Sequence, residues 1–243
     1  MLDALDLRQR LDGAYDAFAP YSRPLVLHVS PLRDSEKLLK QLTSKPMRLL
    51  SVEDVQEYAS AALTTVGTLE DYKYFLPRLI NLAMESGVVE PEMIALKLKG
   101  SEWWAWPKNE QRSLKEIFVY ACMNAFKQHP DDHLAGKWLV SLAILTTDLG
   151  EVRTYILAYN NDCCALQIAH LLLSDTLFAR NPSERAYWEY VPETTVNETR
   201  SWLLCEETRS LLLSVGSRTA SNDAWLLEKA IARQEELIQD RVN

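Results

Sequence analysis

The amino-acid sequence predicts an all-α protein of ten or eleven helices. Apolar residues recur at helical spacing through most of the chain, and a stretch such as 71–86 presents them on one face. Only seven glycines occur in 243 residues, which disfavours the tight turns that a β-sheet protein needs. Helix pairs start near residues 51, 91, 131 and 197. This spacing favours an antiparallel stack similar to HEAT or armadillo repeats, and an irregular compact helical bundle is the alternative.

Prolines and glycines divide the first half of the chain. The expected helices cover residues 2–18, 35–42, 51–66, 68–86 and 91–98. Between the first two helices, residues 25–29 (LVLHV) have the composition of a strand, but no second strand is evident. We expect this segment to be extended and to pack on the helices.

The helix at 68–86 is expected to organise this half. Thr68 and Asp71 have the spacing of a capping box, and Gly87 is placed to end the helix. Pro77 lies inside the helix and away from the apolar stripe, so it should bend the helix convex toward solvent. The apolar stripe consists of Tyr72, Phe75, Leu76, Leu79, Ile80 and Ala83.

The second half is expected to be helical apart from one long connection. That connection, residues 181–196, carries Pro182 and Pro192 and should form an ordered loop or a short helix. We expect a single all-helical domain over residues 1–243, with a possible boundary between two blocks near 181–196. The expected helices cover residues 108–128, 131–149, 151–159, 162–179, 197–214 and 222–240.

Three segments of the chain resemble one family of bacterial proteins. They are KPMRLLSVEDVQEYASAAL, LTTVGTLEDYKYFLPRLINLAMESG and WWAWPKNEQRSLKEIF. The family consists of uncharacterised all-helical proteins that share an FLPR helix, and the resemblance covers residues 20–130. It implies a helical fold and no particular function. Relatives often carry closely spaced cysteines after an early proline, where this chain has Pro24 and then His28, so a metal held by such thiols is not expected here.

The charge and hydropathy of the chain limit its partners. The formal net charge is -8 and no basic run occurs, so we expect no nucleic-acid partner, whereas a basic protein surface would be attracted. No apolar stretch reaches the roughly 18 residues of a membrane span. The N-terminal sequence MLDALDLRQRLDG lacks the positive start and apolar run of a signal peptide. We therefore expect a cytoplasmic protein that binds no membrane.

The densest aromatic cluster is Trp103, Trp104 and Trp106, beside Pro107. Exposed tryptophans are enriched in binding hot spots, so these residues are the candidate contacts with a partner. Packing in the core is the simpler use of a tryptophan, because each ring buries a large area.

The segment His129-Pro-Asp-Asp-His133 offers the ligand types that a transition metal binds. Pro130 separates the two histidines, however, and the segment lacks the H-E-x-x-H pattern of two ligands on one helix. Capping of the following helix by the aspartates explains it more simply. His129 and His133 are therefore weak metal candidates, and we expect no bound metal or cofactor.

His170 shares a narrow polar face with Cys163 and Gln167. Two helical turns, roughly 10 Å, separate Cys163 from His170, which is too far for a base and its nucleophile. We expect the cysteines to be reduced thiols in apolar helices. They are Cys122, Cys163, Cys164 and Cys205.

The sequence contains no phosphate loop, dinucleotide fingerprint, serine elbow or zinc spacing. The leading hypothesis is a non-enzymatic protein–protein interaction module, such as a bacterial regulatory, antitoxin or immunity-type protein, that binds another protein through an acidic surface or groove. The alternative is an enzyme or small-ligand binder with a polar pocket between helices, for which His170 is a candidate. A deep closed cavity would favour the alternative, and a shallow acidic groove would favour the interaction module.

Overall fold

A computed structural model describes residues 4–131, 135–217 and 221–242. Helical residues, counting 3-10 turns, make up 74% of this part of the chain, and it contains no β-strand beyond two isolated bridges. The all-α prediction is therefore confirmed. Thirteen α-helices occur in the described residues, compared with the ten or eleven expected.

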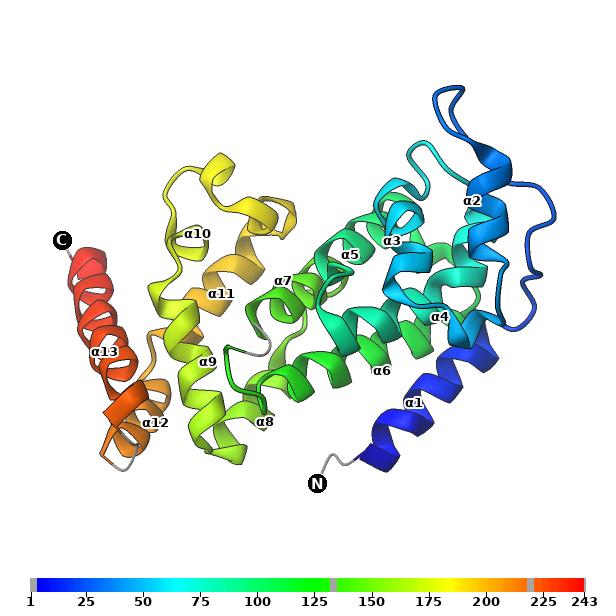
Figure 1. Cartoon of the computed structure of the whole chain (residues 1–243). Helices are drawn as coiled ribbons and strands as arrows, with labels where there is room; N and C mark the ends of the chain where they lie inside the picture. The colour runs from blue at the N-terminus through cyan, green and yellow to red at the C-terminus, as the bar shows by residue number, and fades with distance from the viewer. Residues whose placement is uncertain (1–3, 132–134, 218–220, 243) are drawn as a thin grey trace. The chain divides into compact units, whose positions relative to one another are not determined.

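The contacts divide the chain into two compact units, residues 1–120 and 121–243, and the division falls within helix α6 (Figure 1). Unit 1 begins with α1 and ends in the first part of α6. Its elements are α1 (Ala4–Ala17), α2 (Ser35–Leu42), η1 (Met47–Leu49), α3 (Val52–Ala61), α4 (Leu69–Ser86), α5 (Pro91–Gly100), η2 (Trp103–Ala105) and α6 (Lys108–Ala125).

Helix α4 is the centre of unit 1, where α1, η1, α3 and α5 pack against it. The Thr68 side chain and the Asp71 carboxylate form the predicted capping box, and Gly87 ends the helix with φ 64°. Pro77 lies inside the helix as predicted, but the expectation that it faces solvent is wrong. Pro77 is buried, because packed elements cover α4 on more sides than its apolar stripe indicated.

Helix α3 ends at Ala61 and does not continue to residue 66. The Lys97 ammonium donates to the carbonyls of Ser60 (3.1 Å) and Ala62 (2.6 Å), so a side chain satisfies carbonyls that another helical turn would have used. The chain then pairs with the predicted extended segment. Val29 forms an isolated antiparallel bridge with Val66, in which the Ser30 N–H donates to the carbonyl of Thr65 at 2.9 Å.

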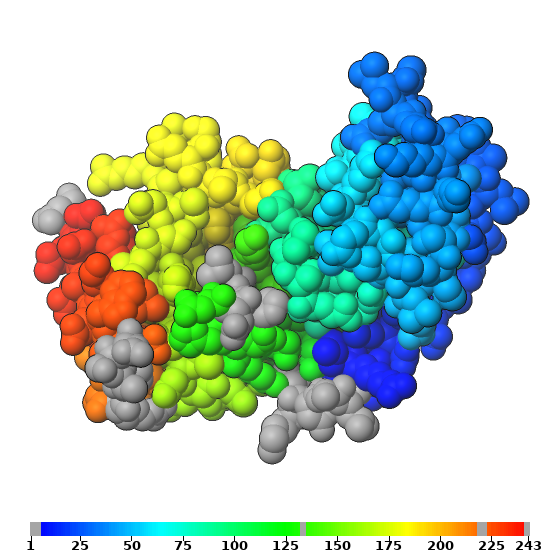
Figure 2. All heavy atoms as spheres, viewed as in Figure 1, coloured from blue at the N-terminus to red at the C-terminus, as the bar shows by residue number. Residues whose placement is uncertain are grey.

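The connection between α1 and α2 is the most exposed apolar part of unit 1. Leu32 is 97% exposed, and Leu25 and Val26 are also exposed. Figure 2 shows part of the blue segment that precedes α2 standing out from the surface of this unit.

Unit 2 is built around α9, which packs against α7, α12 and α13. Two helices that the sequence predicts as continuous are broken, and these breaks raise the helix count. The break at Ser174 separates α9 from α10, and the break at Cys205 separates α11 from α12. The elements after α6 are α7 (Ala135–Leu145), α8 (Gly150–Tyr159), α9 (Asp162–Leu173), α10 (Asp175–Phe178), η3 (Pro182–Glu184), η4 (Ala186–Tyr190), α11 (Glu193–Leu203), α12 (Glu206–Gly216) and α13 (Ser221–Val242).

Side-chain hydroxyl groups form hydrogen bonds at both breaks. Ser174 is extended (φ -74°, ψ 121°), and its hydroxyl lies 2.9 Å from that of Thr176. After α11, the Thr208 hydroxyl donates to the carbonyl of Trp202 at 2.8 Å, which satisfies a carbonyl at the end of that helix. Helices of the described residues are all too short or too polar to cross a membrane.

Candidate functional site

The first candidate site is the tryptophan turn, residues 101–106 of unit 1, between α5 and α6. Its backbone is fixed by local hydrogen bonds from Ala105 N–H to the Glu102 carbonyl (2.8 Å) and from Trp106 N–H to the Trp103 carbonyl (3.1 Å). The Gln111 side-chain amide, on the first turns of α6, donates to the carbonyls of Trp104 (2.8 Å) and Trp106 (2.6 Å). Backbone and side-chain bonds therefore hold the turn in one conformation.

The three tryptophans have different surroundings. Trp106 is only 7% exposed, its indole N–H donates to the Ser101 carbonyl at 3.0 Å, and its ring packs edge-on against Phe18 with 6.2 Å between centroids. Trp103 is half-buried, whereas Trp104 is 54% exposed. Partner binding by these residues stays a prediction, and Trp104 is the ring with surface available to a partner.

A buried polar cluster supports the turn from below. Lys73 Nζ on α4 lies 2.8 Å from Glu110 Oε2 on α6 and 3.9 Å from the centre of the Trp106 ring. The Lys73 ammonium also donates to the Tyr21 hydroxyl (2.8 Å), which donates to Glu110 Oε1 (2.7 Å). The ammonium thus has an anion, a hydroxyl and an aromatic face around it. This cluster fixes Trp106, and through it the base of the turn.

Sequence patterns did not reveal this cluster. Helical periodicity places Lys73 largely off the apolar stripe of α4 and so predicts that it is exposed. Lys73 is buried because Tyr21 and Trp106, from other parts of the chain, cover that side of the helix. Burial raises the pKa of the Tyr21 hydroxyl, and the hydrogen bond from Lys73 opposes this shift. Both charged side chains are nearly inaccessible to solvent, with exposed fractions of 7% for Lys73 and 3% for Glu110, so the cluster is not an open site on the surface.

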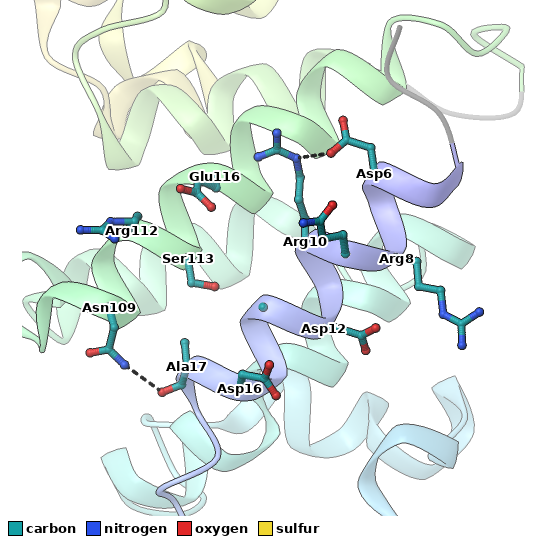
Figure 3. Close-up of a pocket in the computed structure, with 12 residues that line it drawn as sticks. Asp6, Arg8, Arg10, Asp12, Asp16, Ala17, Asn109, Arg112, Ser113 and Glu116 are labelled. Atoms are coloured by element: carbon teal, nitrogen blue, oxygen red, sulfur yellow. Dashed lines mark hydrogen bonds and ion pairs between the residues drawn. The ribbon is translucent and has the colours of Figure 1, made fainter.

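The second candidate is the α1–α6 groove, a depression of ≈ 1110 Å³ between these two helices of unit 1 (Figure 3). Among the described residues that line the groove, only Gly13 and Ala17 lack a polar side chain. Enclosed, mainly apolar pockets are typical of small-molecule sites, so this composition does not favour the enzyme or ligand-binder alternative. The other lining residues are Asp6, Arg8, Gln9, Arg10, Asp12, Asp16, Asn109, Arg112, Ser113 and Glu116.

Comparisons with known proteins identify no counterpart of either site. No protein-family model, curated protein or solved structure matches the chain.

The histidines do not form a described metal site. His129 Nε2 lies 3.6 Å from Asp223 Oδ2 on α13, and its Nδ1 accepts the N–H of Asp131 at 3.3 Å. His133 lies outside the described residues. Among the residues that are described, no group of three or more His, Cys, Asp or Glu side chains could hold a metal ion.

The polar face of α9 also has a structural explanation. Gln167 is buried, accepts the Ala135 N–H at 2.9 Å and donates to the Gln128 carbonyl at 3.0 Å, so it joins α9 to the start of α7 and to the segment that follows α6. His170 is exposed, and partial desolvation lowers its pKa. Burial raises the pKa of Cys164 to about 12, which disfavours the thiolate that a nucleophile requires.

Proposed function

We propose that this protein is a non-enzymatic interaction module that binds another protein, with Trp104 at the centre of the contact. The observation that carries the proposal is an exposed tryptophan on a turn whose backbone is held by hydrogen bonds from Ala105, Trp106 and Gln111. Because the turn is already ordered, binding would lose little conformational entropy there. A regulatory, antitoxin-type or immunity-type protein is the class that such a module suits.

The charge distribution supports a basic partner. Residues 121–243 contain 17 Asp or Glu and 11 Lys or Arg, which leaves -6 of the total charge of -8 in unit 2. An acidic surface attracts a basic protein at long range and accelerates the encounter, whereas a rigid aromatic contact slows dissociation. Under this proposal, salt weakens association mainly by lowering the rate of binding.

We also propose that the consecutive helices of unit 1 stack on one another in the manner of HEAT repeats. The packing of consecutive helices, α2 on α3, α3 on α4 and α4 on α5, supports this arrangement. In unit 2 the contacts of α9 with α12 and α13 join helices that are distant in sequence, which is typical of a bundle.

A matched pair of tryptophan variants tests the function. Trp225 on α13 is 53% exposed, almost the same fraction as Trp104, but lies in the other unit. Tagged wild type, Trp104→Ala and Trp225→Ala would be used to capture proteins from a lysate of the source organism, and the affinity of any captured protein would then be measured with purified components. We expect Trp104→Ala to weaken binding by at least about 30-fold, the factor for a 2 kcal/mol hot spot, and Trp225→Ala to have little effect.

The positioning role of Gln111 provides a second readout. Gln111→Ala removes both hydrogen bonds to the turn while leaving Trp104 in place, so we expect a smaller loss of affinity than with Trp104→Ala. Equal affinity of wild type and Trp104→Ala for the captured protein, with both folded by circular dichroism, would contradict the proposal.

A further inference from the structure

The α1–α6 groove has charged side chains with no partner of their own. Asp6 is paired with Arg10 at 3.1 Å, and Asp12 is paired with Arg48 at 2.6 Å. The side chains of Asp16, Arg112 and Glu116 are exposed and make no hydrogen bond or ion pair with any other described residue. The carboxylates of Asp16 and Glu116 and the guanidinium of Arg112 are therefore available to a partner. Arg10 is also available in part, because Asp6 accepts only one of the hydrogen bonds that a guanidinium can donate.

The two walls of the groove run in opposite directions. At one end, the Asn109 amide lies 3.4 Å from the Ala17 carbonyl (Figure 3). At the other end, the Arg10 guanidinium lies 5.6 Å from the centre of the Tyr120 ring. Gly13 lies between these ends on α1 and lines the groove. A Cβ atom added at Gly13 would meet no atom within 4 Å, so the helix backbone is open to close approach at this point.

Opposite charges are placed symmetrically about the middle of the groove. On α1, Arg10 and Asp16 lie three residues before and three residues after Gly13, which puts all three on one helical face. On α6, Arg112 and Glu116 lie two residues on either side of position 114, and their spacing of four residues also puts them on one face. A two-fold axis that lies between two copies and runs across both helices at the level of Gly13 would therefore bring each of these charges opposite a charge of the other sign.

We propose that a second copy of this chain covers the α1–α6 groove, in an isologous dimer in which α1 faces α1 and α6 faces α6, and the two α1 helices cross at Gly13. Arg10 of each copy pairs with Asp16 of the other, and Arg112 of each copy pairs with Glu116 of the other. An isologous contact requires a patch that is complementary to itself, which the charge order of both walls satisfies. The glycine at the crossing point lets the two α1 helices approach closely. The dimer is independent of the proposed role of Trp104, because it uses other residues.

Complementary charge reversals test the pairing. Arg10→Glu alone would place a carboxylate opposite Asp16, and Asp16→Lys alone would place an ammonium opposite Arg10, so each variant repels its own copy. In an equimolar mixture, both contacts between the two different chains join opposite charges. By analytical ultracentrifugation we expect dimers for wild type, monomers for each variant alone and dimers again for the mixture. Lys40→Glu is the matched control, because it changes the net charge by the same amount as Arg10→Glu at an exposed position of α2 that does not line the groove.

Gly13→Leu tests the close approach without altering any charge. The open space at Gly13 accommodates the side chain within one copy, and leucine favours a helix more than glycine does, so the thermal midpoint should not fall. The dissociation constant of the dimer should nevertheless rise at least about tenfold. Raising the ionic strength from about 0.1 M to about 1 M, which shortens the Debye length from about 10 Å to about 3 Å, should weaken the wild-type dimer as well.

Three results would overturn the dimer. One is a wild-type protein that remains monomeric at roughly 1 mM, the weak end of specific association. Another is a dimer that survives Arg10→Glu, Asp16→Lys and Gly13→Leu, which would place the interface elsewhere. The third is a mixture of the two charge variants that stays monomeric although both variants are folded by circular dichroism. None of these results bears on binding of another protein by Trp104, so failures of the two proposals are distinguishable.

Discussion

Lys73 and Glu110 form an ion pair inside unit 1, with 2.8 Å between Nζ and Oε2, although the two residues are 37 positions apart in the sequence. Burying two charges is costly, and the pair is tolerated because Tyr21 bonds to both of them and the Trp106 ring lies beside the ammonium. The pair thus joins α4, α6 and the tryptophan turn.

Removing one member of the pair should therefore destabilise the protein strongly. Lys73→Met leaves the Glu110 carboxylate buried without its cation, and we expect unfolding by urea to show a loss of about 3–5 kcal/mol. Lys73→Met combined with Glu110→Met should recover about 1–3 kcal/mol relative to the sum of the single losses. The control is Glu57→Ala, which breaks a more exposed pair with Arg33 and should cost less than about 1 kcal/mol. Additive losses in the double variant would show that the two charges do not interact.

The apolar stripe of α4 predicts a second large effect. Phe75 is fully buried, with its ring centroid 5.0 Å from that of Tyr58 and 4.8 Å from that of Tyr74. Phe75→Ala should reduce the free energy of unfolding by about 3–5 kcal/mol, because the cavity adds to the lost apolar burial. Leu69→Ala, at an exposed position of the same helix, should change it by no more than about 0.5 kcal/mol. A loss below about 1 kcal/mol for Phe75→Ala would mean that this face of α4 does not line a core.

Sequence reasoning succeeded where structure is determined locally. The capping box at Thr68–Asp71 is present, Gly87 takes a left-handed conformation, and α5 starts at Pro91, where the predicted helix over 91–98 begins. Each of these features depends on residues within one helical turn. Short-range side-chain chemistry therefore predicted how these helices begin and end.

The breaks in unit 2 and the buried cluster in unit 1 were missed for a physical reason. The apolar pattern continues across Ser174 and Cys205, so periodicity alone gives one helix where there are two. The contact of Lys73 with Glu110 depends on which helices become neighbours, and no local pattern reports that. Among the three candidate tryptophans, exposure was likewise decided by tertiary packing, which buried Trp106.

The long connection after α10 should be held by Arg185. This buried guanidinium pairs with Glu193 at 2.6 Å and donates from Nε to the Ala179 carbonyl at 2.9 Å and from Nη2 to the Arg180 carbonyl at 3.3 Å. A lysine cannot reproduce this fork of donors, so Arg185→Lys should increase amide hydrogen exchange across 179–193. Exchange in α4, in the other unit, is the internal control and should not change. Unchanged exchange across 179–193 would show that the connection is ordered without Arg185.

Tyr72 and Tyr21 should respond in opposite ways to removal of their hydroxyl groups. The Tyr72 hydroxyl is buried and has no hydrogen-bond partner among the described residues, so Tyr72→Phe should leave the free energy of unfolding at pH 7 unchanged or raise it by up to about 1 kcal/mol. The Tyr21 hydroxyl bonds to Lys73 and Glu110, so Tyr21→Phe should lower it by about 1.5–3 kcal/mol.

The pH dependence of Tyr72→Phe follows from the same burial. Burial raises the pKa of Tyr72 in the folded protein above its unfolded value of 10.0. Above pH 10 the unfolded chain therefore releases this proton while the folded protein keeps it, so stability falls as the pH rises. Urea unfolding between about pH 9 and about pH 11 should show a shallower loss for Tyr72→Phe than for wild type. Parallel curves for the two proteins would mean that the Tyr72 hydroxyl is accessible to solvent in the folded state.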